Sequence, residues 1–212
     1  MVEIKEELQK AIVELRKDPN ANRKFEQTVD LIINLQKFDV KKTPLNTFIS
    51  VPHKIKDKRV AGFLEAKNSH VDTILPEEFK RYSDKKEIKK LVNHYDFFIA
   101  QASVMPKVAT TFGRALGPTG KMPSPQLGIL MNIDDKEVAK LKDKINTSVK
   151  IRVKEPSIKI SIGKQKMKDE DLIDNILAFY NSLIKLLPKE RDNVKNLEIK
   201  FTMTKPQKIK LR

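Results

Sequence analysis

Apolar residues recur along this chain with a helical period in some segments and with a period of two in others. Ile4, Leu8 and Leu15 fall on one face of a helix, which predicts a helix over residues 2–17. The triplet Asp18-Pro19-Asn20 that follows is typical of a helix end.

Residues 25–35 alternate between two sets of side chains, as expected of a strand with one buried face. Phe25, Gln27 and Val29 begin the set that should be buried, and Glu26 and Thr28 begin the other set. Two further short strands are predicted at 47–52 and 59–65.

The centre of the chain alternates between helices and strands. Residues 96–101, DFFIAQ, are nearly all apolar, which is typical of a strand buried on both faces. This alternation favours a parallel or mixed sheet in an α/β arrangement. The predicted helices are 73–83, 85–95, 106–116 and 135–146, and a further strand is predicted at 148–154.

The end of the chain returns to strands around a single helix. Residues 157–163 alternate, and an apolar stripe from Leu172 to Leu187 predicts a long helix. Three acidic residues, 169–171, lie in its first turn, where negative charge suits the helix dipole. The last main strand carries Leu197, Ile199 and Phe201 on one face, and Ile209 and Leu211 close the chain.

The pattern predicts an α/β (α+β) fold of two domains. Residues 1–62 and 156–212 would form one discontinuous domain, and residues 63–155 would be inserted into it. The linkers are expected near Ala61-Gly62 and near Glu155-Pro156, and such paired crossings usually form a hinge.

The 212 residues carry a net charge of +15, most of it in the two end segments. Such a surplus repels itself and is often offset by a polyanion, with nucleic acid the first candidate and an anionic membrane surface the second. We therefore expect the main polyanion contact on the discontinuous domain.

Composition also excludes several kinds of site. The chain has no cysteine, which excludes disulfides, thiolate metal sites and cysteine catalysis, and its three histidines are widely spaced. We expect no catalytic residue, metal or cofactor. The charged N-terminus and the lack of an apolar run of roughly 18 residues predict neither signal peptide nor membrane span, and hence a cytoplasmic protein.

The stretch LGPTGKMPSPQLG, residues 116–128, contains a Gly-Lys pair that suggests a phosphate-binding loop. A P-loop requires serine or threonine after the lysine, whereas Met122 follows Lys121, and Ala115 stands where the first glycine belongs. Prolines also remove backbone donors. The stretch is interpreted either as a rigid cap over the inserted sheet or as a direct ligand contact.

GRALGPTGKMPSPQLG, residues 113–128, resembles the signature of the ribosomal protein L-one family. The matching positions are Leu116, Gly117, Pro118, Gly120, Met122, Pro123 and Pro125. Residues 23–35, 50–53, 157–164 and 200–211 resemble other strands and a hairpin of that family in the same order. The Thr-Met-Thr triplet near the end is closer to archaeal than to bacterial members.

The resemblance implies a discontinuous split β-α-β (ferredoxin-like) RNA-binding domain, and an inserted Rossmann-like α/β/α domain of three layers joined to it by a hinge. It also implies a structural constituent of the large ribosomal subunit, at the mobile stalk near the tRNA exit site. The implied partners are large-subunit rRNA, the exit-site tRNA whose release it helps, and its own operon mRNA, which it represses. The protein would be a monomer when free.

RNA helices are recognised through shape, 2′-hydroxyls and phosphates, which calls for short polar side chains with cations around them. Glu26 can accept from a 2′-hydroxyl or stand as a solvated charge, and Phe25 can be a core residue or a contact. By resemblance and position, the candidate contacts are Arg23, Lys24, Phe25, Glu26, Thr28, Lys159, Lys164, Thr202, Met203, Thr204 and Lys205.

Two other functions compete with this interpretation. A nucleotide-dependent enzyme using the inserted domain predicts a glycine-rich phosphate turn and an acid-base pair, and the sequence has neither; Asp134-Asp135 fits a helix cap better than a metal site. A general RNA chaperone predicts basic low-complexity tails, which the sequence lacks. The sequence favours the structural, non-enzymatic role in the ribosome.

Overall fold

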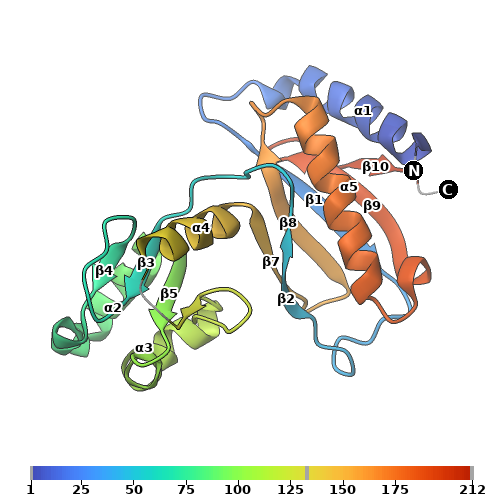
Figure 1. Ribbon diagram of the computed structural model, residues 1–212. Coiled ribbons are helices and arrows are strands. Elements are labelled where there is room, and N and C mark those ends of the chain that lie inside the picture. Colours follow the sequence, from blue (N-terminus) through green and yellow to red (C-terminus); the bar gives the residue numbers. More distant parts are fainter. Residues whose placement is uncertain (1, 132–133, 211–212) are drawn as a thin grey trace. The chain divides into compact units, whose positions relative to one another are not determined.

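The computed structural model describes residues 2–131 and 134–210, so that Leu211 lies outside the described residues. The chain divides into two compact units. The first is formed by Met1–Lys56 and Thr147–Arg212, and the second by Asp57–Asn146 (Figure 1). The first unit is thus built from both ends of the chain, and the second lies between them in the sequence.

The first unit is built on a four-stranded antiparallel sheet in the order β10-β9-β1-β8. β1 (Thr28–Leu35) lies between β8 (Ser157–Lys164) and β9 (Val194–Phe201), and β10 (Gln207–Ile209) pairs with the outer side of β9. β8 and β9 are consecutive strands joined by the helix α5 (Asp169–Leu186), and β1 separates them. This is a split β-α-β arrangement.

One face of this sheet forms the core of the first unit. Val29, Leu31 and Ile33 of β1 are fully buried in one apolar cluster with α5 and with α1 (Val2–Lys17). Figure 1 shows both helices over the same side of the sheet. The intervening residues of β1 remain half exposed on the opposite face, as a period of two requires. A separate pair, β2 (Asn46–Ser50) with β7 (Ser148–Arg152), completes the unit, together with the short 3-10 helices η1 (Pro19–Ala21) and η3 (Glu190–Asn193).

The second unit is a parallel sheet in the order β4-β3-β5-β6, with helices on both faces. Its strands are β3 (Val60–Phe63), β4 (Asp72–Ile74), β5 (Phe97–Gln101) and β6 (Ile129–Leu130). Phe63, Phe98 and Ala100 face α2 (Lys85–His94) and α3 (Met105–Thr119). Val60 and Ile99 face α4 (Asp135–Asn146). The predicted three-layer α/β/α architecture is therefore confirmed.

The boundaries between the units differ from those expected. Ala61 and Gly62 lie inside β3, bonded to β4 and β5 on either side, so they are not a linker. Glu155 and Pro156 connect β7 to β8 within the first unit, because β7 pairs with β2 rather than with the inserted sheet. The chain instead passes from one unit to the other at 56–57 and at 146–147.

Two predicted elements also need correction, and one short strand was not predicted. Residues 73–83 are not one helix: β4 ends at Ile74, and a 3-10 helix, η2 (Pro76–Ser83), follows it. β6 has only two residues, too few to show a period. The strand expected from Phe25 begins at Thr28, because the preceding residues leave the ladder.

The signature stretch is half helix and half loop. α3 continues through Leu116, Gly117 and Pro118 to Thr119, and Gly120 ends it in the left-handed conformation, with φ 72°. The Gly120 N–H donates to the Gly117 carbonyl (3.0 Å) and the Lys121 N–H to the Leu116 carbonyl (3.0 Å). These two bonds are a Schellman cap, which satisfies carbonyls at the end of the helix.

Lys121 also has a structural role. Its amine donates to the carbonyls of Val92 (2.6 Å) and Tyr95 (2.7 Å), at the C-terminal end of α2. A cation there suits the helix dipole. The lysine of the Gly-Lys pair therefore ties α3 to α2, which contradicts a phosphate-binding role for this pair and favours the rigid-cap interpretation.

Gly120 of this cap and Gly113 within α3 should respond oppositely to alanine. Gly120→Ala should lower the free energy of unfolding by about 1–2 kcal/mol, because an L-residue is strained in the left-handed region. Gly113→Ala should raise it by up to about 1 kcal/mol, because Gly113 is helical and a Cβ there meets nothing within 4 Å. Urea denaturation followed by circular dichroism measures both. Equal effects of the same sign would contradict the capping role.

Candidate nucleic-acid interface

The predicted contact segments meet at one end of the first unit's sheet. Thr28 opens β1, Lys164 ends β8 opposite it, and Thr202 follows β9 on the other side. The Thr28 N–H donates to Thr202 Oγ1 (3.1 Å), and the Thr202 N–H donates to the Thr28 carbonyl (3.2 Å). Their two hydroxyl oxygens lie 3.0 Å apart. Segments far apart in the sequence thus form one continuous surface.

Two large apolar side chains lie on this surface in contact with water. Phe25 is 52% exposed and Met203 is 49% exposed. The alternation had put Phe25 on the buried face, but the strand has not yet begun there. Exposed apolar side chains among polar and charged ones are what unstacked bases and ribose rings can pack against.

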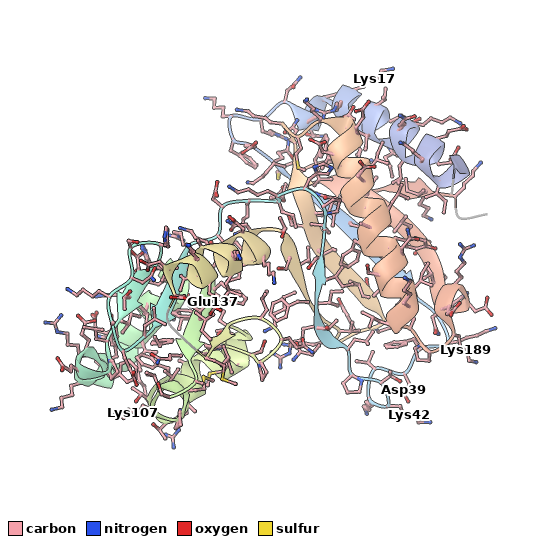
Figure 2. The ribbon with its side chains drawn as sticks, in the orientation of Figure 1. Lys17, Asp39, Lys42, Lys107, Glu137 and Lys189 are labelled. Atoms are coloured by element: carbon pink, nitrogen blue, oxygen red, sulfur yellow. The ribbon has the colours of Figure 1, made fainter. Side chains whose placement is uncertain are left out.

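Cations border these apolar side chains. Arg23, Lys24 and Lys205 are exposed, and Lys164 lies 4.0 Å from a carboxylate oxygen of Glu26. Arg23 donates to the side chain of Asn20 (2.7 Å), which fixes its direction. Charged side chains extend outward elsewhere on the two units as well, among them Lys17, Lys189 and Lys107 (Figure 2). Position rather than charge alone therefore distinguishes the candidate surface.

Lys159 lies apart from this group. It pairs with Ile32 near the other end of β8, and its amine forms an exposed ion pair with Glu155 (2.9 Å). It borders a shallow hollow of about 320 Å³ on the open face of the sheet, with Asp30, Ile32, Ile160, Ser161 and Lys200. The structure places it on that face rather than at the end of the strands.

Thr204 does not offer its side chain to a ligand. It is only 4% exposed, and its hydroxyl accepts from the Phe201 N–H (2.9 Å). The Thr204 N–H in turn donates to the Phe201 carbonyl (3.2 Å). Threonine here closes the turn after β9 with its side chain turned inward, so only its backbone is left for the predicted contact.

Sequence reasoning missed Asp30 on the open face. Burial raises the pKa of its carboxyl, while the Thr28 hydroxyl, which donates to it (3.3 Å), and the nearby Lys200 oppose that rise. Lys200 also donates to the Thr202 carbonyl (3.1 Å). A half-buried acid beside a predicted anion-binding surface lowers the local positive charge, and nothing in the alternation marked it as different from its neighbours.

It also missed Gln27, whose side chain is completely buried. Its amide donates to the backbone before β1 and accepts from the Met203 N–H (2.9 Å). The signal was present, because Gln27 is the polar residue in the face of the strand that should be buried.

The surface has the features of a binding site rather than of a catalytic one. Within residues 2–131 and 134–210, no group of acidic or histidine side chains is arranged to hold a metal ion. No helix in this part of the chain is long and apolar enough to cross a membrane. Hydroxyls, exposed backbone, an aromatic ring and flexible cations are suited to holding an RNA backbone and bases.

Comparison with known proteins agrees with this chemistry. A model of the Ribosomal protein L1p/L10e family matches residues 15–205. The chain belongs to this family. The match spans both units, from the end of α1 to the turn after β9, and it confirms the resemblance of the signature stretch.

Archaeal relatives cover almost the whole chain. "Large ribosomal subunit protein uL1" of Methanothermobacter thermautotrophicus is 35% identical over 95% of this chain and 95% of its own length. The proteins of the same name from Methanobrevibacter smithii and Nanoarchaeum equitans are 36% and 32% identical, over 88% and 85% of this chain and 91% and 90% of their own lengths. Membership of this L1 family gives the protein a structural, non-enzymatic role.

Asp30 makes the stability of this L1-family protein depend on pH. Because the folded-state pKa lies above the ordinary 3.8, the neutral acid favours the folded state, and that contribution is lost as pH rises through the raised pKa. Asp30→Asn keeps the acceptor for Thr28 without the charge, so it should be more stable than the wild type at pH 7 and equal to it near pH 3. Urea denaturation at several pH values measures this.

The control is Glu14→Gln, which also removes one negative charge, but from the exposed face of α1. It should change stability little at either pH, because exposed charges on a surface contribute weakly. An Asp30→Asn protein that is less stable than the wild type at pH 7 would contradict the account of Asp30.

Proposed function

We propose that the protein is a constituent of the large ribosomal subunit, in the cytoplasmic ribosome, and binds large-subunit rRNA at the mobile stalk through its first unit. The observation that carries this is the convergence of Phe25, Thr28 and Met203 at one end of the sheet, with cations around them. Family membership supports the ribosomal assignment. The names of its archaeal relatives, large-subunit proteins, support the choice of subunit.

Each kind of side chain has a distinct part in the proposed contact. Phe25 and Met203 pack against exposed bases or riboses, which gives affinity that salt does not abolish. Thr28 and Thr202 exchange hydrogen bonds with 2′-hydroxyls, and Glu26 accepts from one. Arg23, Lys24, Lys164 and Lys205 approach phosphates, with Lys159 at the margin, and this share of the affinity falls with salt.

The same surface is proposed to serve the finer functions that the resemblance implies. The mRNA of its own operon would bind there because it folds into a structure that mimics the rRNA site. Free protein would then repress translation of that mRNA. The protein would be a monomer when free, and on the stalk it would meet exit-site tRNA and help its release.

We propose that the hinge lies at the two points where the chain passes between the units, 56–57 and 146–147. Ala61-Gly62 and Glu155-Pro156 lie within the units instead. Small-angle scattering with and without RNA tests that hinge, and identical profiles would contradict it.

Binding to the stalk fragment of large-subunit rRNA, compared with a scrambled RNA of the same length, tests the function. Across a salt series the stalk RNA should bind roughly a thousandfold more tightly, and the preference should persist as salt rises, because only the phosphate contribution is lost to counterions. Equal affinities that fall together with salt would reduce the protein to a general RNA binder and contradict the proposal.

Substitutions separate the two contributions in the same titration. Phe25→Ala should weaken stalk binding by roughly 10- to 100-fold without changing the salt slope. Lys24→Ala should lower the slope by about one, because one phosphate contact is lost. Val13→Ala removes an apolar side chain exposed on α1, outside the surface, and serves as the control. An unchanged affinity for Phe25→Ala would remove Phe25 from the contact.

A further inference from the structure

The three segments that carry the proposed contacts extend beyond the strand ladder of the sheet. Residues 23–27 precede β1, residues after Lys164 follow β8, and Thr202 and Met203 follow β9. Backbone pairing therefore holds Thr28 beside Lys164 but does not by itself fix the residues before β1 or the turn of Met203 after β9. The hydrogen bonds that reach them from side chains become important for that reason.

Gln27 makes three of these bonds from a fully buried position. Its Nε2 donates to the carbonyls of Asn20 (2.8 Å) and Ala21 (2.8 Å). Its Oε1 accepts from the Met203 N–H (2.9 Å). One amide thus joins the chain before β1 to the turn after β9. A buried amide that loses its partners is costly, so these bonds are strongly favoured in the folded protein.

Gln165 connects the third segment to the same place. Its N–H donates to the Gln27 carbonyl (3.0 Å), and its side-chain Nε2 donates to the Ala21 carbonyl (3.1 Å). Gln165 directly follows Lys164, the last residue of β8. The loop after β8 is therefore fixed to the backbone of the segment before β1, at Ala21 and at Gln27 itself.

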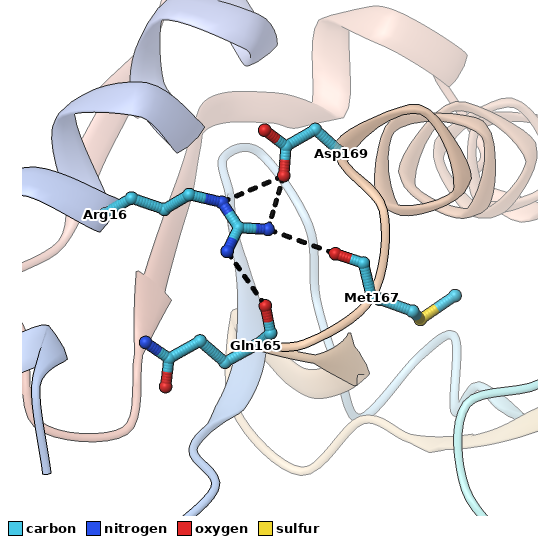
Figure 3. Close-up of polar contacts among 4 residues, drawn as sticks. All are labelled: Arg16, Gln165, Met167 and Asp169. Atoms are coloured by element: carbon cyan, nitrogen blue, oxygen red, sulfur yellow. Dashed lines mark hydrogen bonds and ion pairs between the residues drawn. The ribbon is translucent and has the colours of Figure 1, made fainter.

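Arg16 supports this loop from the end of α1 (Figure 3). Its guanidinium donates to the carbonyls of Gln165 (3.0 Å) and Met167 (3.0 Å). Two of its nitrogens also donate to a single carboxylate oxygen of Asp169, with Nε at 2.9 Å. Only a planar guanidinium offers donors in this fixed fork, which an ammonium group cannot reproduce.

We propose that Gln27 is a positioning residue for RNA recognition, supported by Gln165 and Arg16. The network sets the positions of Phe25 and Met203 relative to Thr28 and Lys164, which the strand ladder already pairs, before RNA arrives. Gln27 itself touches no RNA because it is buried. Ordering these groups in advance removes an entropic cost from binding. This inference rests on the proposed rRNA-binding function and adds residues that act through others.

Gln27→Met keeps the size of the side chain and removes its donor and acceptors. It should weaken binding to the stalk RNA by roughly 10- to 100-fold, leave the salt slope unchanged, and leave affinity for the scrambled RNA unchanged. A residue that merely supported the fold would alter stability without altering the preference between the two RNAs. Thermal denaturation accompanies the titration.

The matched control is Asn175→Leu. Asn175 is also a fully buried amide of the first unit, and it bonds the backbone of His53 (2.9 and 3.1 Å) and Ile162 (3.3 Å) instead of the contact segments. The Asn175→Leu protein should lose about as much stability as the Gln27→Met protein and should keep its preference for the stalk RNA. If Gln27→Met keeps that preference as Asn175→Leu does, the inference is overturned.

Arg16→Lys tests the network without altering the buried core. The substitution keeps the net charge but removes the planar set of donors that bonds Gln165, Met167 and Asp169. Stalk binding should therefore weaken by roughly three- to tenfold, at an unchanged salt slope. The control, Arg191→Lys, makes the same change beside the opposite end of β9. Equal affinities of these two variants would overturn the inference even if Gln27→Met does not fold. A wild type without preference for the stalk RNA would instead overturn the proposed function.

Discussion

The pairing of β1 with both β8 and β9 is the constraint on which the rest of the structure depends. It joins residues 28–35 to strands that lie beyond residue 156, so the second unit has to be an excursion from a sheet that the chain later completes. The same pairing places Val29, Leu31 and Ile33 under α1 and α5, and it brings Thr28, Lys164 and Thr202 to one end of the sheet. Fold and candidate interface therefore have one origin.

The interface itself depends on a second layer of interactions. Where the strand ladder ends, side chains continue it. The buried Gln27 holds the turn of Met203, the buried Thr204 closes that turn, and Arg16 at the end of α1 fixes the loop after β8. These side chains leave Phe25 and Met203 exposed to water although both are apolar. Exposing them is unfavourable in isolation, and in the proposed contact a base or ribose would compensate by covering them.

Long, strongly periodic segments could be predicted from the sequence. The alternation from Val29 to Leu35, the apolar run in β5 and the stripe of α5 each repeat over enough residues to fix the element and its buried face. β4 and β6 are too short to show a period. Ala61 and Gly62 were mistaken for a linker because small residues also occur in a strand packed closely on both sides.

The candidate site was found only in part, for a similar reason. The contact segments were identified by resemblance, which this chain's membership of the L1 family supports. Their supports could not be identified: Arg16 looks like an ordinary basic residue at a helix end, and only the three-dimensional structure shows that it reaches Gln165 and Asp169. Thr204 looked exposed because the alternation of β9 ends before it, although a turn then buries it.

Hydrogen exchange of the protein without RNA tests the central claim, that the interface is already ordered before binding. The informative amides are those of Thr28, Gln165 and Met203, which donate to Thr202, Gln27 and the Gln27 side chain. The account predicts that all three exchange far more slowly than in an unstructured chain and slow little further when stalk RNA is added. Exchange at the rate of an unstructured chain, with protection only after RNA is added, would contradict it.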